Sequence, residues 1–150
     1  MLYETIIAKI PLGELAETLE YINRNEESDE RADAENKMDK FLYEINARAA
    51  HMTKSVKEVN INFVEVYGAN QVKFAVKVYG ANQVKFAMAE IDTNEDDEPV
   101  YGLGIIALDD DGNEIASYNA EIGADSVLVF HRVEGACNVL VYIEQDNKED

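Results

Sequence analysis

Near the start of the chain, the spacing of apolar residues changes once, from every second position to every third or fourth position. Residues 2–10 are rich in β-branched and aromatic side chains that roughly alternate with polar ones, and Pro11 follows them. This pattern predicts an opening strand that ends at the proline. Apolar residues then recur every three or four positions through Asn23, which predicts a short amphipathic helix. Its apolar positions are Leu12, Leu15, Ala16, Leu19 and Ile22.

A second and longer helix is predicted over about residues 29–56, which contain neither glycine nor proline. Ser28 is the expected N-cap, acidic residues occupy the first turns, and Lys54 and Lys57 lie near the last turn, as the helix dipole favours. An apolar seam repeats along this helix at intervals of four and three residues, and Phe41 widens it. The seam consists of Met38, Leu42, Ile45, Ala49, Met52 and Val56.

This seam must be buried against a partner surface. We expect it to pack on the protein's own sheet, with self-association through the helix as the alternative. His51 lies just off the seam, and a lone histidine there is expected to be partly exposed and structural rather than a ligand.

After Lys57 the period of the pattern changes to two, which predicts a series of strands separated by turns. The acidic run 109–114 and the segment 134–136 are predicted to be turns of antiparallel hairpins. The strands of the second hairpin, 127–133 and 137–143, are largely apolar on both faces, so they should be central and covered on both sides. The helices can cover one face, and a second layer or a second subunit must cover the other.

Residues 64–75 read VEVYGANQVKFA and residues 76–87 read VKVYGANQVKFA, with Glu65 against Lys77 as the single difference. Such identity includes turn positions that packing would not constrain, which favours a recent or engineered tandem duplication inserted into a parent of 138 residues. A natural replication slip without function is the alternative. The even length of the insert preserves the alternation of side chains between the two faces of a sheet.

The duplication allows two structural outcomes. Both turns form and an extra strand joins the sheet, or one copy occupies the hairpin while the other is extruded. We expect the extra strand, because an extruded apolar segment would leave strand edges and apolar surface in water. Since both copies offer nearly the same contacts, the chain is also expected to have access to two registers.

These elements predict a single α+β domain over residues 1–150. It has an N-terminal strand and two helices, the second one long, packed on an antiparallel sheet of about six or seven strands. No apolar run approaches the ~18 residues of a membrane span, and the first residues lack the features of a signal peptide. We therefore expect a soluble, cytoplasmic protein without a membrane partner. The single Cys137 rules out an internal disulfide.

Acidic residues dominate the composition, with thirty-one aspartates and glutamates against thirteen basic residues and a net charge of −18. Residues 86–150 alone carry seventeen of the acids and two basic residues. Such a chain repels nucleic-acid backbones and anionic lipids, so direct binding to either is not expected. The charge is interpreted either as a solvated surface or as an electrostatic decoy that imitates a phosphate path.

Candidate chemistry is sparse. The run 109–114 lacks the flanking oxygen ligands of a calcium loop, and residues 102–104 lack the third glycine of a dinucleotide fingerprint. His131 and Cys137 flank the last hairpin turn but lack an orienting third group, and Glu121 with Asp125 has no spacing that guarantees convergence. The sequence therefore implies no enzyme, no cofactor and no metal site.

The function expected from the sequence is that of a non-enzymatic acidic interaction protein, such as an inhibitor or a nucleic-acid mimic, that binds a basic protein surface. The alternative is a small-ligand-binding module with its site at a subunit interface, and the doubly apolar strands also favour a homo-oligomer. The expected partner-binding residues are the exposed carboxylates of two loops: Glu95, Asp96, Asp97, Glu98, Asp109, Asp110 and Asp111.

Overall fold

A computed structural model describes residues 4–53, 58–67, 70–77, 81–133 and 138–146. Within these ranges the chain forms two helices and eight strands, so the predicted α+β class is confirmed, including the N-terminal strand and the long second helix. In chain order the elements are β1 (Glu4–Pro11), α1 (Gly13–Asn23), α2 (Asp29–Thr53), β2 (Glu58–Tyr67), β3 (Asn70–Lys77), β4 (Gln83–Thr93), β5 (Pro99–Leu108), β6 (Glu114–Ala120), β7 (Ser126–Val133) and β8 (Asn138–Asp146).

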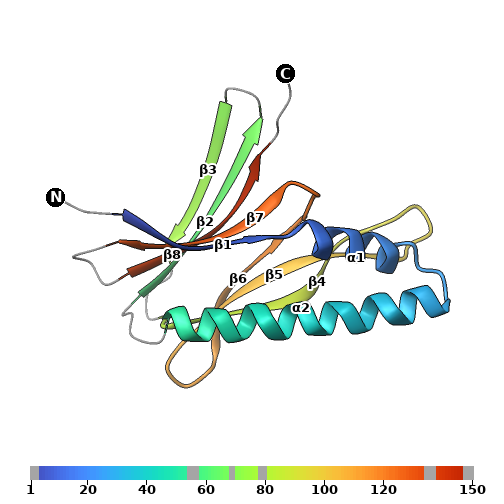
Figure 1. Ribbon diagram of the computed structural model, residues 1–150, viewed down its shortest axis with the longest axis horizontal. Coiled ribbons are helices and arrows are strands. Elements are labelled where there is room, and N and C mark those ends of the chain that lie inside the picture. Colours follow the sequence, from blue (N-terminus) through green and yellow to red (C-terminus); the bar gives the residue numbers. More distant parts are fainter. Residues whose placement is uncertain (1–3, 54–57, 68–69, 78–80, 134–137, 147–150) are drawn as a thin grey trace.

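The strands are divided between two sheets rather than joined in one. A five-stranded sheet has the order β1-β7-β8-β2-β3, and a three-stranded sheet has the order β4-β5-β6. Neighbouring strands are antiparallel except β2 and β8, which are parallel. Strands β2 and β3 project away from the helices, whereas β4, β5 and β6 lie close to them (Figure 1). The division occurs between β3 and β4, within the second copy of the repeat.

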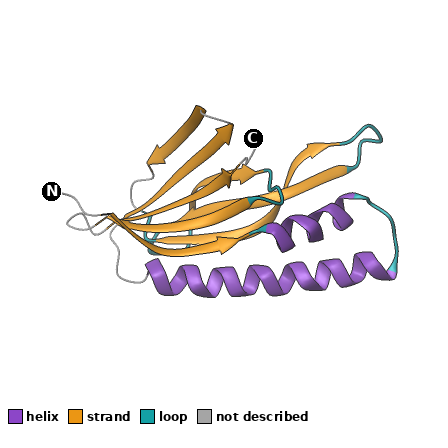
Figure 2. Cartoon of the chain, turned by 45° about the horizontal axis from the view of Figure 1, so that its top comes forward, coloured by secondary structure: helices purple, strands orange, loops and turns teal. Residues whose placement is uncertain are grey.

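Both helices lie on the same side of the strands (Figure 2). Four of the five predicted apolar positions at α1 and its N-cap are buried, namely Leu12, Leu15, Leu19 and Ile22, while Ala16 is partly buried. The N-cap prediction for α2 is confirmed, because the Oγ of Ser28 accepts a hydrogen bond of 3.1 Å from the backbone amide of Arg31. Lys54, Val56 and Lys57, expected at the end of this helix, lie outside the described residues.

The apolar seam of α2 packs within the same chain, as predicted. Met38, Ile45, Ala49 and Met52 are buried in a core shared with residues of both sheets, and Leu42 and Phe41 pack at its margin. The helix contacts β4 most extensively among the strands. His51 is exposed, in line with its expected position off the seam.

Two asparagines tie the helices to the backbone of the three-stranded sheet. Asn46 of α2 donates to the carbonyl oxygen of Phe86 (2.9 Å) and accepts from its amide (2.7 Å). Asn23 of α1 makes the same pair of bonds with Tyr101, at 3.0 and 2.7 Å. Each side-chain amide thus satisfies two backbone groups that the β ladder leaves unpaired.

Strand β7 is covered on both faces, as its sequence predicts. The consecutive residues Leu128, Val129 and Phe130 are all fully buried within the single chain. Successive residues of a strand point to opposite faces, so these three need no second subunit to cover them. Homo-oligomerisation itself remains a prediction.

The predicted hairpin at residues 109–114 is confirmed, since β5 and β6 pair antiparallel around it. The carboxylate of Asp109 organises the turn by accepting hydrogen bonds from the amides of Asp111 (3.0 Å) and Asn113 (2.8 Å). Gly112 adopts a positive φ of 81°, which a glycine accommodates without strain. Strands β7 and β8 also pair antiparallel, while their turn at 134–137 lies outside the described residues.

The two copies of the repeat occupy different places in the fold. The first copy includes the end of β2 and most of β3, which pair antiparallel. The second begins at the end of β3 and continues into β4, whose partner is β5 in the other sheet. An added strand, β3, therefore joins β2 at the sheet edge, but the described parts of β3 and β4 do not pair with each other.

Candidate functional site

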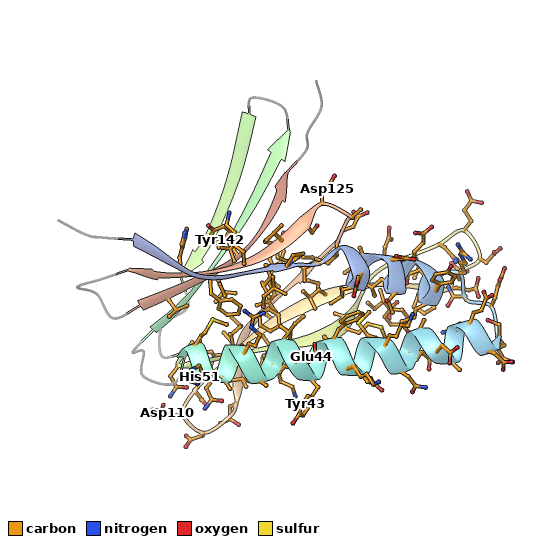
Figure 3. The ribbon with its side chains drawn as sticks, viewed as in Figure 1. Tyr43, Glu44, His51, Asp110, Asp125 and Tyr142 are labelled. Atoms are coloured by element: carbon orange, nitrogen blue, oxygen red, sulfur yellow. The ribbon has the colours of Figure 1, made fainter. Side chains whose placement is uncertain are left out.

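The acidic residues predicted to bind a partner lie in two loops at opposite ends of β5. Residues 95–98 precede this strand and residues 109–111 follow it. A strand of ten residues separates the loops by about 30 Å. Asp110 lies near the end of α2 that carries His51, far from the link between the helices (Figure 3). The two clusters therefore do not form one continuous patch.

The loop before β5 is built around Asn94. Its Oδ1 accepts hydrogen bonds from the amides of Asp96 (2.8 Å) and Glu98 (3.0 Å), and Asp97 adopts a positive φ of 59°. Asn25 donates to the carbonyl oxygen of Pro99 (3.3 Å), which places this loop beside the end of α1 (Figure 1). The loop's negative charge consequently lies at the same end of the molecule as the α1–α2 link.

A groove of about 540 Å³ runs between α1 and α2. Its buried floor includes Thr18 and Ala34, whose small side chains leave space between the two helices. Partly buried aromatic rings and one lysine line the walls, and four exposed carboxylates form the rim. The wall residues are Tyr21, Phe41 and Lys37, and the rim residues are Glu14, Glu17, Glu30 and Asp33.

The groove's charge and its rings are both suited to cations. Four carboxylates face a single ammonium group, so negative charge is in excess. The guanidinium of Arg24 already lies over the ring of Tyr21, 4.5 Å from its centre, and is also 3.9 Å from Glu20. A cationic side chain can therefore use an aromatic face and a carboxylate at the same time in this part of the molecule.

An apolar hollow of about 480 Å³ adjoins the groove. Glu14 and Phe41 line both spaces, so the two are adjacent. Most of the hollow's wall is aliphatic, and its charged members are Glu14, Glu44 and Arg48. Its aliphatic residues include Ile10, Leu12, Leu15 and Ile45.

The other candidates from the sequence have structural explanations or fall outside the description. The hydroxyl of Tyr142 lies 3.1 Å from Nδ1 of His131, and Cys137 is outside the described residues. Gly102 and Gly104 lie within β5, where a Cβ on Gly102 would collide with the carbonyl oxygen of Ala120. These glycines permit close strand packing.

In the described part of the chain, no group of three histidine, cysteine, aspartate or glutamate side chains is arranged to hold a metal ion. Neither helix in that part is long and apolar enough to cross a membrane.

Comparison of the chain with protein-family models, curated proteins and solved structures found no match in any of the three.

Sequence reasoning missed the groove because it weighed the acids by their density along the chain. A different signal was present. Glu14 and Glu17, and Glu30 and Asp33, are pairs spaced by three residues on two successive helices, and such spacing places both members of a pair on one helix face. Two acidic faces joined by a short link could have been recognised as opposing walls.

Proposed function

We propose that the protein is a non-enzymatic acidic interaction protein that binds a basic and partly apolar segment of another protein in the α1–α2 groove. The observation that carries this proposal is the combination of four rim carboxylates, two aromatic walls and an adjoining apolar hollow. A surface that was only solvated would need the carboxylates but not the rings or the hollow.

Binding would use two forces with different ranges. The net charge of −18 attracts a basic partner from a distance and raises its association rate. At contact, the rim carboxylates pair with lysine or arginine, while Tyr21 and Phe41 cover the aliphatic stems of those side chains. An apolar partner residue in the adjoining hollow would add affinity that does not depend on salt.

The role of an inhibitor follows from the same chemistry. A basic segment that normally contacts phosphates would find carboxylates in their place, so binding here would compete with its nucleic acid. The loop at residues 95–98, beside the end of α1, would extend the negative field at this end of the groove. The loop at residues 109–111 lies at the opposite end of β5 from that loop, and none of its residues lines the groove or the hollow.

The test measures binding of a short synthetic peptide of lysine and leucine at several salt concentrations. Neutralising the rim with Glu14→Gln, Glu17→Gln, Glu30→Gln and Asp33→Asn together should weaken binding at low salt by at least about fourfold, because each exposed pair contributes ~0.2–1 kcal/mol. Circular dichroism of the variant checks that the loss of acids near the start of α2 leaves the helix intact.

The matched control is the triple variant Asp109→Asn, Asp110→Asn and Asp111→Asn, which removes charge from the distant loop. It should leave the affinity within about twofold of the original protein. An equal loss of affinity in both variants would show that the peptide is attracted by net charge alone and not bound in the groove. If a peptide of lysine and serine bound as tightly as the peptide of lysine and leucine, the apolar hollow would not contribute to binding.

A further inference from the structure

The segment Asn-Gln-Val-Lys-Phe-Ala occurs twice, at residues 70–75 and 82–87. The first occurrence lies in β3 at the edge of the five-stranded sheet. The second, which continues into β4, lies at the edge of the three-stranded sheet. Two identical sequences thus end up in two different sheets, each at the point where its sheet stops.

The register of β2 with β3 shows which residue types pair with the outer edge of β2. Phe63 lies opposite Phe74, and Asn62 lies opposite Ala75. A shift of twelve residues replaces these partners by Phe86 and Ala87, which are the same residue types in the same order. A backbone ladder on this edge therefore accommodates either copy, and the shift keeps every side chain on its original face.

The outer edge of β4 is oriented for such pairing. Phe86 lies opposite Ile105 of β5, yet its amide and carbonyl both bond to Asn46. In a strand, the two backbone groups of one residue point to the same side, so those of Phe86 point away from β5. They can bond β2 without breaking the pairing of β4 with β5. For β4 to pair with β2, Asn46 must release the backbone of Phe86 and β3 must leave the edge of β2.

We propose that the outer edge of β2 is a binding site for an extended Asn-Gln-Val-Lys-Phe-Ala segment, and that residues 82–87 of the same chain are its second ligand. When β3 is absent, β4 takes its place, and the two sheets close into one with the order β1-β7-β8-β2-β4-β5-β6. The duplication supplies β3, which competes with β4 for the edge of β2 and so keeps the two sheets separate.

The first experiment deletes residues 76–87 and locates cross-strand contacts by nuclear magnetic resonance. In the shortened chain, Phe74 should show backbone contacts with both Phe63 and Ile105. In the complete chain these contacts are divided between Phe74 and Phe86. A folded deletion variant in which Phe74 contacts only one of the two strands overturns the proposal.

The second experiment keeps the complete chain, so it does not depend on the folding of the deletion variant. In a Cys137→Ser background, the pair Asn62→Cys with Ala75→Cys should form a disulfide in the observed register. The pair Asn62→Cys with Ala87→Cys reports pairing of the second copy with β2 and should also cross-link within one chain, at a lower yield. Absence of this second cross-link, or its formation only between chains, would contradict the same-chain site.

Asn46 provides the control on mechanism. Asn46→Ala frees the outward groups of Phe86, so it should raise the yield of the second cross-link severalfold. Asn23→Ala breaks an equivalent pair of bonds on Tyr101 of β5 and should leave that yield unchanged. Equal increases in the two variants would attribute the exchange to general destabilisation rather than to the edge of β4.

Discussion

Replacing Phe86 by alanine is expected to lower the free energy of unfolding by about 3–5 kcal/mol. The side chain is 1% exposed, and its ring meets that of Phe130 edge to face with centres 6.2 Å apart. Because Phe86 belongs to β4 and Phe130 to β7, this contact joins the two sheets. Its loss leaves a cavity at their junction and should be measured by chemical denaturation.

Phe74 provides an internal comparison, since it occupies the same position in the other copy of the repeat. Measuring Phe74→Ala beside Phe86→Ala shows whether the two copies of the repeat contribute equally to stability. A cost at Phe86 below about 0.5 kcal/mol, as expected of an exposed position, would show that its ring is not part of the core.

Ile45→Ala should lower the free energy of unfolding by about 2–5 kcal/mol, through cavity formation beneath α2. The side chain is 5% exposed and belongs to the core that the helix shares with both sheets. Thermal or denaturant unfolding followed by circular dichroism measures the loss.

Tyr43→Ala on the same helix is the matched control, since Tyr43 is 77% exposed and points away from the sheets (Figure 3). It should change stability by no more than about 0.5 kcal/mol. If both substitutions had similar costs, the inward face of α2 would be wrongly assigned.

The helices could be predicted from the sequence because their signals are local. The seam through Met38, Ile45 and Ala49 repeats with the period of a helix, and Ser28 marks its start. The turn at Asp109 was equally clear, because an aspartate that accepts from nearby amides and a following glycine act within a few residues.

The partners of the strands could not be predicted in the same way. Alternation shows which face of a strand is buried, but it does not show which strand lies beside it. The parallel pairing of β2 with β8 joins segments about eighty residues apart, and nothing local to either strand encodes it. Two identical copies of the repeat made the ambiguity greater, since sequence alone assigns either copy to either sheet.

The sequence predicted that the candidate site would be acidic, but it did not predict that the site lies between α1 and α2. The acids at residues 95–98 and 109–111 are conspicuous in the sequence, but β5 holds the two runs apart. The groove instead depends on the distance between two helices and on the small side chains of Thr18 and Ala34 at its floor. That distance is a tertiary property without a local signal.

The position of β8 between β7 and β2 determines when the five-stranded sheet can be completed during synthesis. β8 follows the other seven described strands in chain order, so β2 lacks this neighbour until residues 138–146 have left the ribosome. Translation adds ~5–20 residues per second, whereas two adjacent strands pair within ~1–10 μs. The newly made β2 therefore meets the first copy of the repeat about a second before the second copy exists. In refolding from denaturant both copies are present from the beginning. The two cross-linked registers should therefore appear in different proportions in refolded and newly translated protein.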